Sequence, residues 1–191
     1  MSKELFDNEI KNALAILRTG GIILYPTDTV WGLGCDATNS EAVQKIFNLK
    51  KREDSKSLIV LMADERDIMQ YVATPDLSVF DFIRQQLRPT TIIYENAIGF
   101  ADNLLAQDGS VAIRIVKDDF CRHLIKRLKK PIVSTSANIS KMTTPATFAE
   151  ISKEIKAGVD YIVQWRQEEN QPVEPSQIIR WKNGEPVFIR S

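Results

Sequence analysis

Short apolar runs alternate with amphipathic stretches along this chain, and this alternation limits the possible folds more than any other feature. The apolar runs predict buried strands at residues 22–25, 58–62, 91–94, 110–115 and 131–134. Helical patterns cover residues 7–19, 64–71, 76–87 and 118–129, with further helices capped by Ser40 and by a capping box of Thr147 and Glu150. Residues 178–190 predict a hairpin with Asn183-Gly184 as its turn. This order favours an α/β fold in which helices flank a mixed sheet.

Length and charge describe an ordinary globular chain that we expect to form a single domain over residues 1–191. A chain of 191 residues needs neither a disulfide nor a metal to stabilise its core. Its 25 basic residues balance its 25 acidic ones, which argues against a protein that coats nucleic acid. No stretch reaches the ~18 apolar residues of a membrane span, and the N-terminus is not a signal peptide. Cys35 and Cys121 stand alone in the sequence, so we expect idle thiols in the cytoplasm.

Several familiar catalytic sites are excluded by the residues present. Gly32-x-Gly34-x-x-Ala37 matches a dinucleotide fingerprint only loosely. The fingerprint requires a strand that leads directly into the glycines and a helix that begins there, whereas here Pro26 ends the strand six residues earlier and the predicted helix begins at Ser40. We interpret the two glycines as a tight turn beside another group. The chain has no P-loop motif. Its single histidine, His123, rules out a histidine-rich metal cage, so catalysis must depend on positioning and charge.

Two segments carry groups suited to an anionic ligand. The segment Tyr25–Gly34 follows a predicted strand and combines hydroxyls, an acid and two glycines, although a simple turn explains it equally well. The cations Lys50, Arg52 and Lys56 suit a polyphosphate. If the preceding helix continues, Lys50 and Arg52 point apart as surface charges, whereas both can turn toward one ligand if it ends near Leu49.

Two further patterns lie at strand ends. Ser134, Ser136 and Asn138 follow an apolar run and would share one face if the chain stays extended, giving a row of hydroxyl and amide groups. Arg114 interrupts a strand that is otherwise apolar, so it needs a partner from elsewhere in the chain or a ligand carboxylate. Together these patterns predict a site for an anionic nucleotide and a small carboxylate-bearing molecule.

The motifs form an ordered series: Pro26–Gly34, Lys50-x-Arg52 with Leu58-Ile59, Ser110–Arg114, Ser134–Ser140, and Pro175–Ile178. In this order they resemble the YrdC/TsaC-like family, the threonylcarbamoyl-AMP synthases, from Gly20 to about Arg190. The resemblance implies a twisted mixed sheet with flanking helices and a large concave cleft. It implies that L-threonine, bicarbonate and ATP become threonylcarbamoyl-adenylate and pyrophosphate. A threonylcarbamoyl-transferase complex would then use the adenylate to form N6-threonylcarbamoyladenosine in tRNAs that read codons beginning with A.

Roles of individual residues follow from the same resemblance. ATP contacts are implied at Lys50, Arg52, Lys56, Ser110, Ser136, Asn138, Thr144 and Arg190, and Lys50 and Arg52 are the catalytic candidates among them. The implied threonine site consists of Thr29, Arg114, Ser134 and Ser176. Mg²⁺ is expected to accompany ATP, with no metal held by the protein and no prosthetic group.

Several residues differ from the family pattern. Glu53, Ser57 and Lys141 replace residues that are common in the family, and Leu61 stands where longer members often have histidine. The chain resembles the short, single-domain type.

One alternative function is a module that binds tRNA or double-stranded RNA, with the basic run of residues 122–130 extending the cleft. The other is a carbamoyl-transferring relative of the hydrogenase maturation domain.

Overall fold

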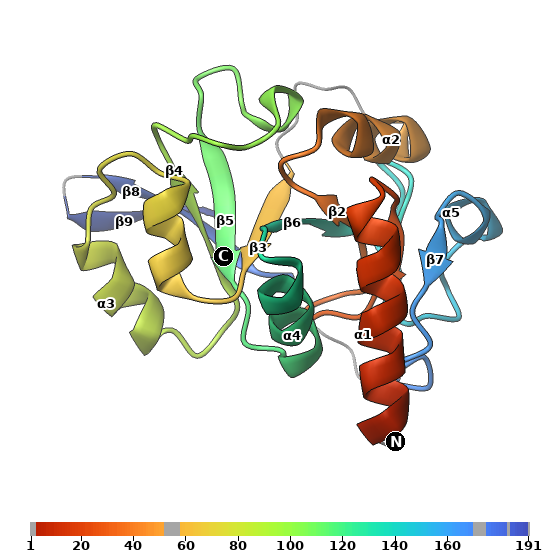
Figure 1. Ribbon diagram of the computed structural model, residues 1–191. Helices are drawn as coiled ribbons and strands as arrows, with labels where there is room; N and C mark the ends of the chain where they lie inside the picture. The colour runs from red at the N-terminus through yellow and green to blue at the C-terminus, as the bar shows by residue number, and fades with distance from the viewer. Residues whose placement is uncertain (1–2, 52–57, 170–174, 183, 191) are drawn as a thin grey trace.

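The protein, described here by a computed structural model, is built on one mixed sheet. The structure describes residues 3–51, 58–169, 175–182 and 184–190. The strands are β1 (Ile23–Tyr25), β2 (Gly32–Asp36), β3 (Ile59–Met62), β4 (Thr90–Tyr94), β5 (Val111–Ile115), β6 (Ile132–Ser136), β7 (Tyr161–Ile162), β8 (Gln177–Lys182) and β9 (Glu185–Arg190). Their order across the sheet is β7-β1-β2-β6-β3-β5-β4-β8-β9 (Figure 1). Parallel pairs (β1/β7, β3/β5, β4/β8) are mixed with antiparallel ones, which confirms the predicted mixed α/β fold.

The helices are α1 (Lys3–Arg18), α2 (Ser40–Lys50), α3 (Ser78–Gln85), α4 (Asp119–Leu128) and α5 (Lys153–Ala157), with 3-10 turns η1 (Glu65–Gln70) and η2 (Asp102–Leu104). Two predicted starts were wrong. Asn39, and not Ser40, caps α2, since its side chain accepts from Ala42 N. Thr147 and Glu150 form no capping box, because Ser152 caps α5 and the Glu150 carboxylate accepts from Ala146 N.

The glycine pair of residues 32 and 34 was predicted as a turn, but it lies inside strand β2. β2 pairs with β1 on one side and β6 on the other, with Gly34 opposite Ser134. A Cβ on Gly34 would come 2.6 Å from Tyr25 Cε1, and one on Gly32 would come 3.1 Å from Ser134 Oγ. Close approach of neighbouring side chains requires glycine at position 34 and favours it at position 32, which explains the spacing without a dinucleotide.

Helices cover the two faces of the sheet unequally. On one face, α2, η1 and α3 pack onto a large apolar cluster. On the other, α1 and α4 lie together over Ile23, Tyr25, Leu61 and Ile132 (Figure 1). Because strand side chains alternate, Ser134 and Ser136 share this second face with Ile132. The part of this face that carries the hydroxyls is left without a helix, and the candidate site lies there.

Within the described ranges, no helix is long and apolar enough to cross a membrane. The same residues contain no group of three or more His, Cys, Asp and Glu placed to hold a metal ion. Cys35 and Cys121 are both buried and unpaired, as expected for idle thiols. Burial raises the pKa of each thiol above its ordinary value, and nearby carboxylates add to the shift.

Candidate functional site

A cavity of about 230 Å³ opens on the uncovered part of the second sheet face. Loops and strands that are far apart in the sequence line it together. The predicted site residues in its wall are Thr29, Arg114, Ser134, Ser136, Thr144, Ser176 and Arg190. The structure therefore brings together all four predicted threonine residues and three of the eight predicted ATP residues.

The loop between β1 and β2 presents Thr29 through a tight hydroxyl turn. Thr27 Oγ1 donates to Val30 O at 2.8 Å and accepts from Thr29 N at 3.0 Å. The two threonine hydroxyls also lie 3.0 Å apart. Since the Thr27 proton is committed to Val30, the Thr29 hydroxyl donates to Thr27. The Thr29 oxygen then keeps its lone pairs for a ligand donor, such as an amine.

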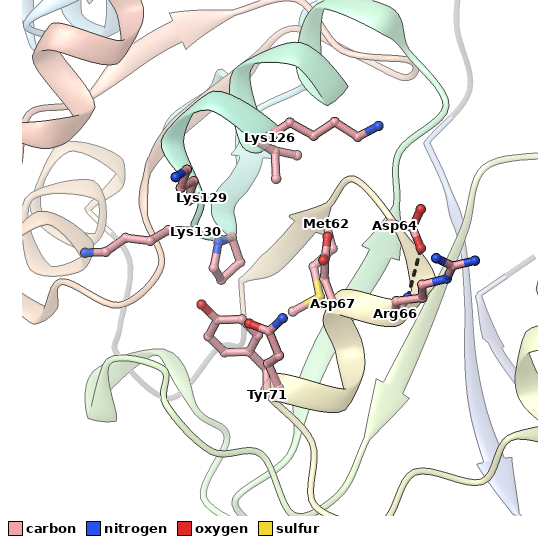
Figure 2. A pocket seen from close by; sticks show the side chains of 11 residues that line it. Met62, Asp64, Arg66, Asp67, Tyr71, Lys126, Lys129 and Lys130 are labelled. Carbon is pink, nitrogen blue, oxygen red and sulfur yellow. Dashed lines mark hydrogen bonds between the residues drawn. The ribbon is translucent and has the colours of Figure 1, made fainter.

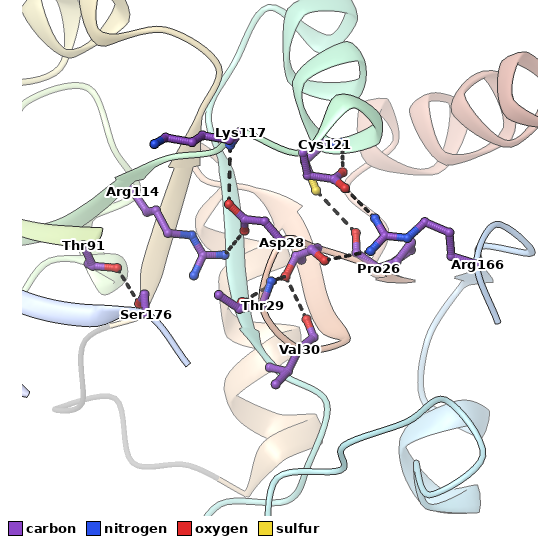
Figure 3. A network of polar contacts seen from close by, with 12 residues as sticks. Pro26, Asp28, Thr29, Val30, Thr91, Arg114, Lys117, Cys121, Arg166 and Ser176 are labelled. Atoms are coloured by element: carbon purple, nitrogen blue, oxygen red, sulfur yellow. Dashed lines mark hydrogen bonds and ion pairs between the residues drawn. The ribbon is translucent and has the colours of Figure 1, made fainter. Parts of the chain in front are cut away.

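Arg114 has a protein partner that the sequence did not reveal. Its Nη2 lies 3.1 Å from Asp28 Oδ1, and the two side chains are 4% and 14% exposed (Figure 3). Arg114 Nε has no hydrogen-bond partner among the residues that the structure describes. A buried guanidinium with an unused N–H fits a further acceptor, and a carboxylate is the natural one.

A second guanidinium, that of Arg190, faces the same cavity. Its Nε and Nη2 donate to Ser176 O at 3.1 and 2.6 Å. Burial, and then the charge of Arg114, lower the pKa of Arg190. The described lining residues include no acid, and only Asp28 beside Arg114 offsets the two cations. The cavity therefore has a positive excess that favours an anionic ligand.

The Ser176 hydroxyl is also held from the protein side. It lies 2.8 Å from Thr91 Oγ1 on β4, and both residues are buried. Ser176 directly precedes β8, whose first residue Gln177 pairs with Thr90, and Thr91 lies opposite Arg114 of β5. The contact with Thr91 thus places the Ser176 side chain on the same part of the sheet as Arg114.

A tether behind the Pro26–Val30 loop was missed by sequence reasoning. The Arg166 guanidinium is paired with Asp118 and Glu169. From its place beside the Pro26–Val30 loop (Figure 3), its Nη2 donates to Thr27 O at 3.3 Å. The buried Cys121 thiol donates to Pro26 O at 3.3 Å. Arg166 has φ +63°, an uncommon conformation for a residue with a side chain. No pattern in the sequence marks this contact, because its members come from distant segments.

The remaining predicted residues lie outside this cavity or outside the described chain. Ser110 lines a neighbouring pocket, where its hydroxyl donates to Asp108 Oδ1 at 2.5 Å. Side-chain alternation along β5 still places Ser110 on the same sheet face as Arg114. Asn138 was expected to share a face with Ser136, but β6 ends at Ser136 and Asn138 Nδ2 donates to Ile139 O and Met142 O. Arg52 and Lys56, with Glu53 and Ser57, lie outside the described residues.

Lys50 ends α2, as required for Lys50 and Arg52 to turn toward one ligand. Its side chain is 1% exposed, and Nζ donates to Ser136 O at 2.5 Å and Asn138 O at 2.6 Å. The ammonium therefore points at the backbone of the loop after β6.

A second cavity, of about 440 Å³, lies between η1 and α4 and shares no lining residue with the first (Figure 2). Lys126, Lys129 and Lys130 of the basic run line it, with Asp64 and Asp67 opposite. Lys130 Nζ is paired with Asp36 at 2.6 Å. Burial, and then the charge of Asp64, raise the pKa of Asp67. The described part of the basic run thus lines a cavity separate from the predicted site, and its role in RNA binding stays a prediction.

Comparison with known proteins gives concordant matches. A family model named for Sua5, YciO and YrdC, and described as telomere recombination, matches residues 15–191. A protein of Methanocaldococcus jannaschii, provisionally named threonylcarbamoyl-AMP synthase, is 33% identical over 98% of this chain and 89% of its own length. The threonylcarbamoyl-AMP synthase of Idiomarina loihiensis is 34% identical over 75% of this chain and 78% of its own.

Solved structures share the fold. P. abyssi Sua5 in complex with L-threonine superposes with a TM-score of 0.83 at 22% identity, over 95% of this chain and 53% of that one. E. coli YciO superposes with a TM-score of 0.81 at 22% identity, over 95% and 87%. The chain therefore spans about half the length of the Sua5 chain but most of YciO.

Proposed function

Because the chain belongs to the Sua5/YciO/YrdC family, we propose that it is an L-threonylcarbamoyladenylate synthase, a nucleotidyltransferase that uses L-threonine, bicarbonate and ATP. The single observation that carries this proposal is the cavity in which Arg114 and Arg190 face a set of hydroxyl groups. The relatives with this name support the reaction, and the cavity supports the substrate class. A small carboxylate-bearing molecule and a phosphate chain both match its positive excess.

Threonine would bind through its carboxylate on Arg114 and through its polar groups on Thr29, Ser134 and Ser176. The position of Arg114 in the cavity wall supports a carboxylate contact, since a guanidinium can bind a carboxylate through two parallel hydrogen bonds. The Thr29 oxygen, left as an acceptor, suits the amine of the substrate. In this arrangement the amine is held near the hydroxyls of β6.

The nucleotide would bind beside threonine. Ser136, Thr144 and Arg190 supply the contacts in the cavity, and Ser110 extends the same sheet face. Asn138 would contribute through the loop after β6. Arg52 and Lys56 are proposed to contact the triphosphate. Mg²⁺ would arrive with the ATP phosphates as part of the substrate.

The reaction needs alignment and charge neutralisation more than covalent help. The threonine amine attacks bicarbonate or CO₂ to give a carbamate, with water as the by-product when bicarbonate reacts. A carbamate oxygen then attacks the α-phosphorus of ATP, and the bond to the β-phosphate oxygen breaks to release pyrophosphate. Arg52 and Lys56 would stabilise the charge that grows on the leaving group. The two guanidiniums of the cavity hold the reacting anions together.

The direct test incubates the purified protein with ATP, bicarbonate and each amino acid in turn. We expect pyrophosphate release and an adenylate product with L-threonine and bicarbonate only. Serine is the matched control, because it lacks only the threonine methyl group. Absence of any threonine-dependent pyrophosphate or adenylate would refute the proposal.

The biological setting is a further part of the proposal. The product would be consumed by a threonylcarbamoyl-transferase complex that modifies tRNAs reading codons that begin with A, in the cytoplasm. Binding of tRNA or double-stranded RNA stays a prediction, and salt-sensitive tRNA binding that competes with ATP would support it.

A further inference from the structure

The ammonium of Lys50 is buried against the loop that follows β6. It donates to the carbonyl oxygens of Ser136 and Asn138, and the Lys50 carbonyl accepts from Ser140 N at 2.9 Å. The main chain and the side chain of one residue thus hold the same loop. A buried cation needs such partners, and two carbonyl dipoles converging on it provide them.

The loop bound by Lys50 carries the nucleotide-facing residues at its two ends. We define the loop as residues 136–144. Asn138 N donates to Ser136 O at 2.9 Å and Asn138 Nδ2 donates to Met142 O at 2.7 Å, which folds the segment back on itself. Ser136 and Thr144 both line the cavity. The shape of the loop therefore sets the spacing between these two hydroxyls.

We propose that Lys50 is a positioning residue that acts on the nucleotide through loop 136–144, and not a phosphate ligand. This inference rests on the proposed function, since it concerns how ATP is bound. To reach a phosphate in the cavity, the ammonium would have to leave two carbonyl acceptors in a buried site. Lys50 is 1% exposed and is not among the described residues that line the cavity, whereas Ser136, whose carbonyl accepts from its ammonium, is one of them.

The chemistry of the side chain supports this role. A lysine ammonium has three donors around one atom, so it can bind two carbonyls that converge on a point. The planar fork of arginine does not fit such a geometry. Lys50→Arg is therefore expected to fail in rescuing the loop, although it conserves the charge.

The test compares AMP, ADP, ATP and L-threonine binding by calorimetry in the wild type, Lys50→Met and Lys50→Arg. Lys51→Met is the matched control, because the Lys51 side chain is exposed and its ion pair with Glu154, at 2.7 Å, lies on the surface. We expect both Lys50 variants to lose affinity for all three nucleotides by the same factor, about tenfold, with threonine affinity unchanged within about twofold. The control should change none of the four affinities.

Two results would overturn the proposal. A loss that grows from AMP to ATP would show direct phosphate contact, and an equal loss for threonine would show a merely structural role. Hydrogen exchange adds a measurement that does not depend on ligands. The backbone amides of residues 136–144 should exchange faster in Lys50→Met than in the wild type. Equal exchange rates in the two proteins would refute the claim that Lys50 stabilises the loop. If the wild type shows no threonine-dependent pyrophosphate release, the proposed function fails separately, while the exchange comparison still tests Lys50.

Discussion

Replacing Asp28 by asparagine removes one charge of the Arg114 pair and keeps the side-chain shape. Arg114 is then left almost fully buried without a carboxylate. At 3.1 Å and an effective dielectric constant of ~20, the two charges attract by about 5 kcal/mol before desolvation. Breaking a buried pair costs roughly 3–5 kcal/mol, and the 14% exposure of Asp28 puts this case at the lower end. We expect Asp28→Asn to lower the free energy of unfolding by ~3 kcal/mol.

A bound carboxylate changes this cost. The threonine carboxylate would give Arg114 a replacement negative charge, so threonine should recover about 1.4 kcal/mol of the loss. By thermodynamic linkage, Asp28→Asn then binds threonine about tenfold more tightly than the wild type.

Urea unfolding with and without L-threonine measures both effects. Asp81→Asn is the control, because Asp81 pairs with Arg84 on the surface, where its side chain is 75% exposed, and the expected change is within ~0.5 kcal/mol. Two results would refute the reasoning: an Asp28→Asn variant as stable as the wild type, or equal stabilisation of both proteins by threonine.

Three further predictions follow from the contacts behind the site and in the core. Arg166→Met removes the hydrogen bond to the Thr27 carbonyl and should raise the KM for threonine severalfold, while the KM for ATP stays constant. The control is Arg127→Met, which removes an exposed ion pair with Asp7 and should change neither KM. Gly34→Ala places a Cβ 2.6 Å from a ring carbon and should destabilise by roughly 1–3 kcal/mol in urea; wild-type stability would contradict the close packing. Both thiols should resist iodoacetamide until urea unfolds the chain, as mass spectrometry can show. Since burial raises their pKa values in the folded state, the unfolding free energy should fall as pH rises above the ordinary thiol pKa of about 9, and a flat profile there would contradict this.

Periodicity predicted the sheet well where the strands are apolar and β-branched. β2 was missed because Gly32-Leu33-Gly34 has two residues that disfavour strands, and only the close approach of Tyr25 and Ser134 explains them. The start of α5 was predicted too early, at Thr147, because a capping-box pattern is short and also occurs by chance. In the structure Ser152 caps this helix.

The site was predictable where strand alternation sets side-chain direction, as for Ser134 and Ser136. It was not predictable for Asn138, because nothing in the sequence marks Ser136 as the last residue of its strand. The partner of Arg114 also stayed hidden, since Asp28 reaches it only through the tertiary fold. An ion pair between residues far apart in the sequence leaves no local pattern from which it can be predicted.

The β8–β9 hairpin closes one side of the cavity from the edge of the sheet. It joins the rest of the sheet through the pairing of β8 with β4. Ile178 and Arg190 belong to this hairpin and line the cavity, so a ligand that contacts them binds only the form in which β8 is paired with β4. Each such ligand therefore adds its binding free energy to the cost of opening this edge. The saturated enzyme should fray less at this edge and offer fewer unpaired strand groups to other chains.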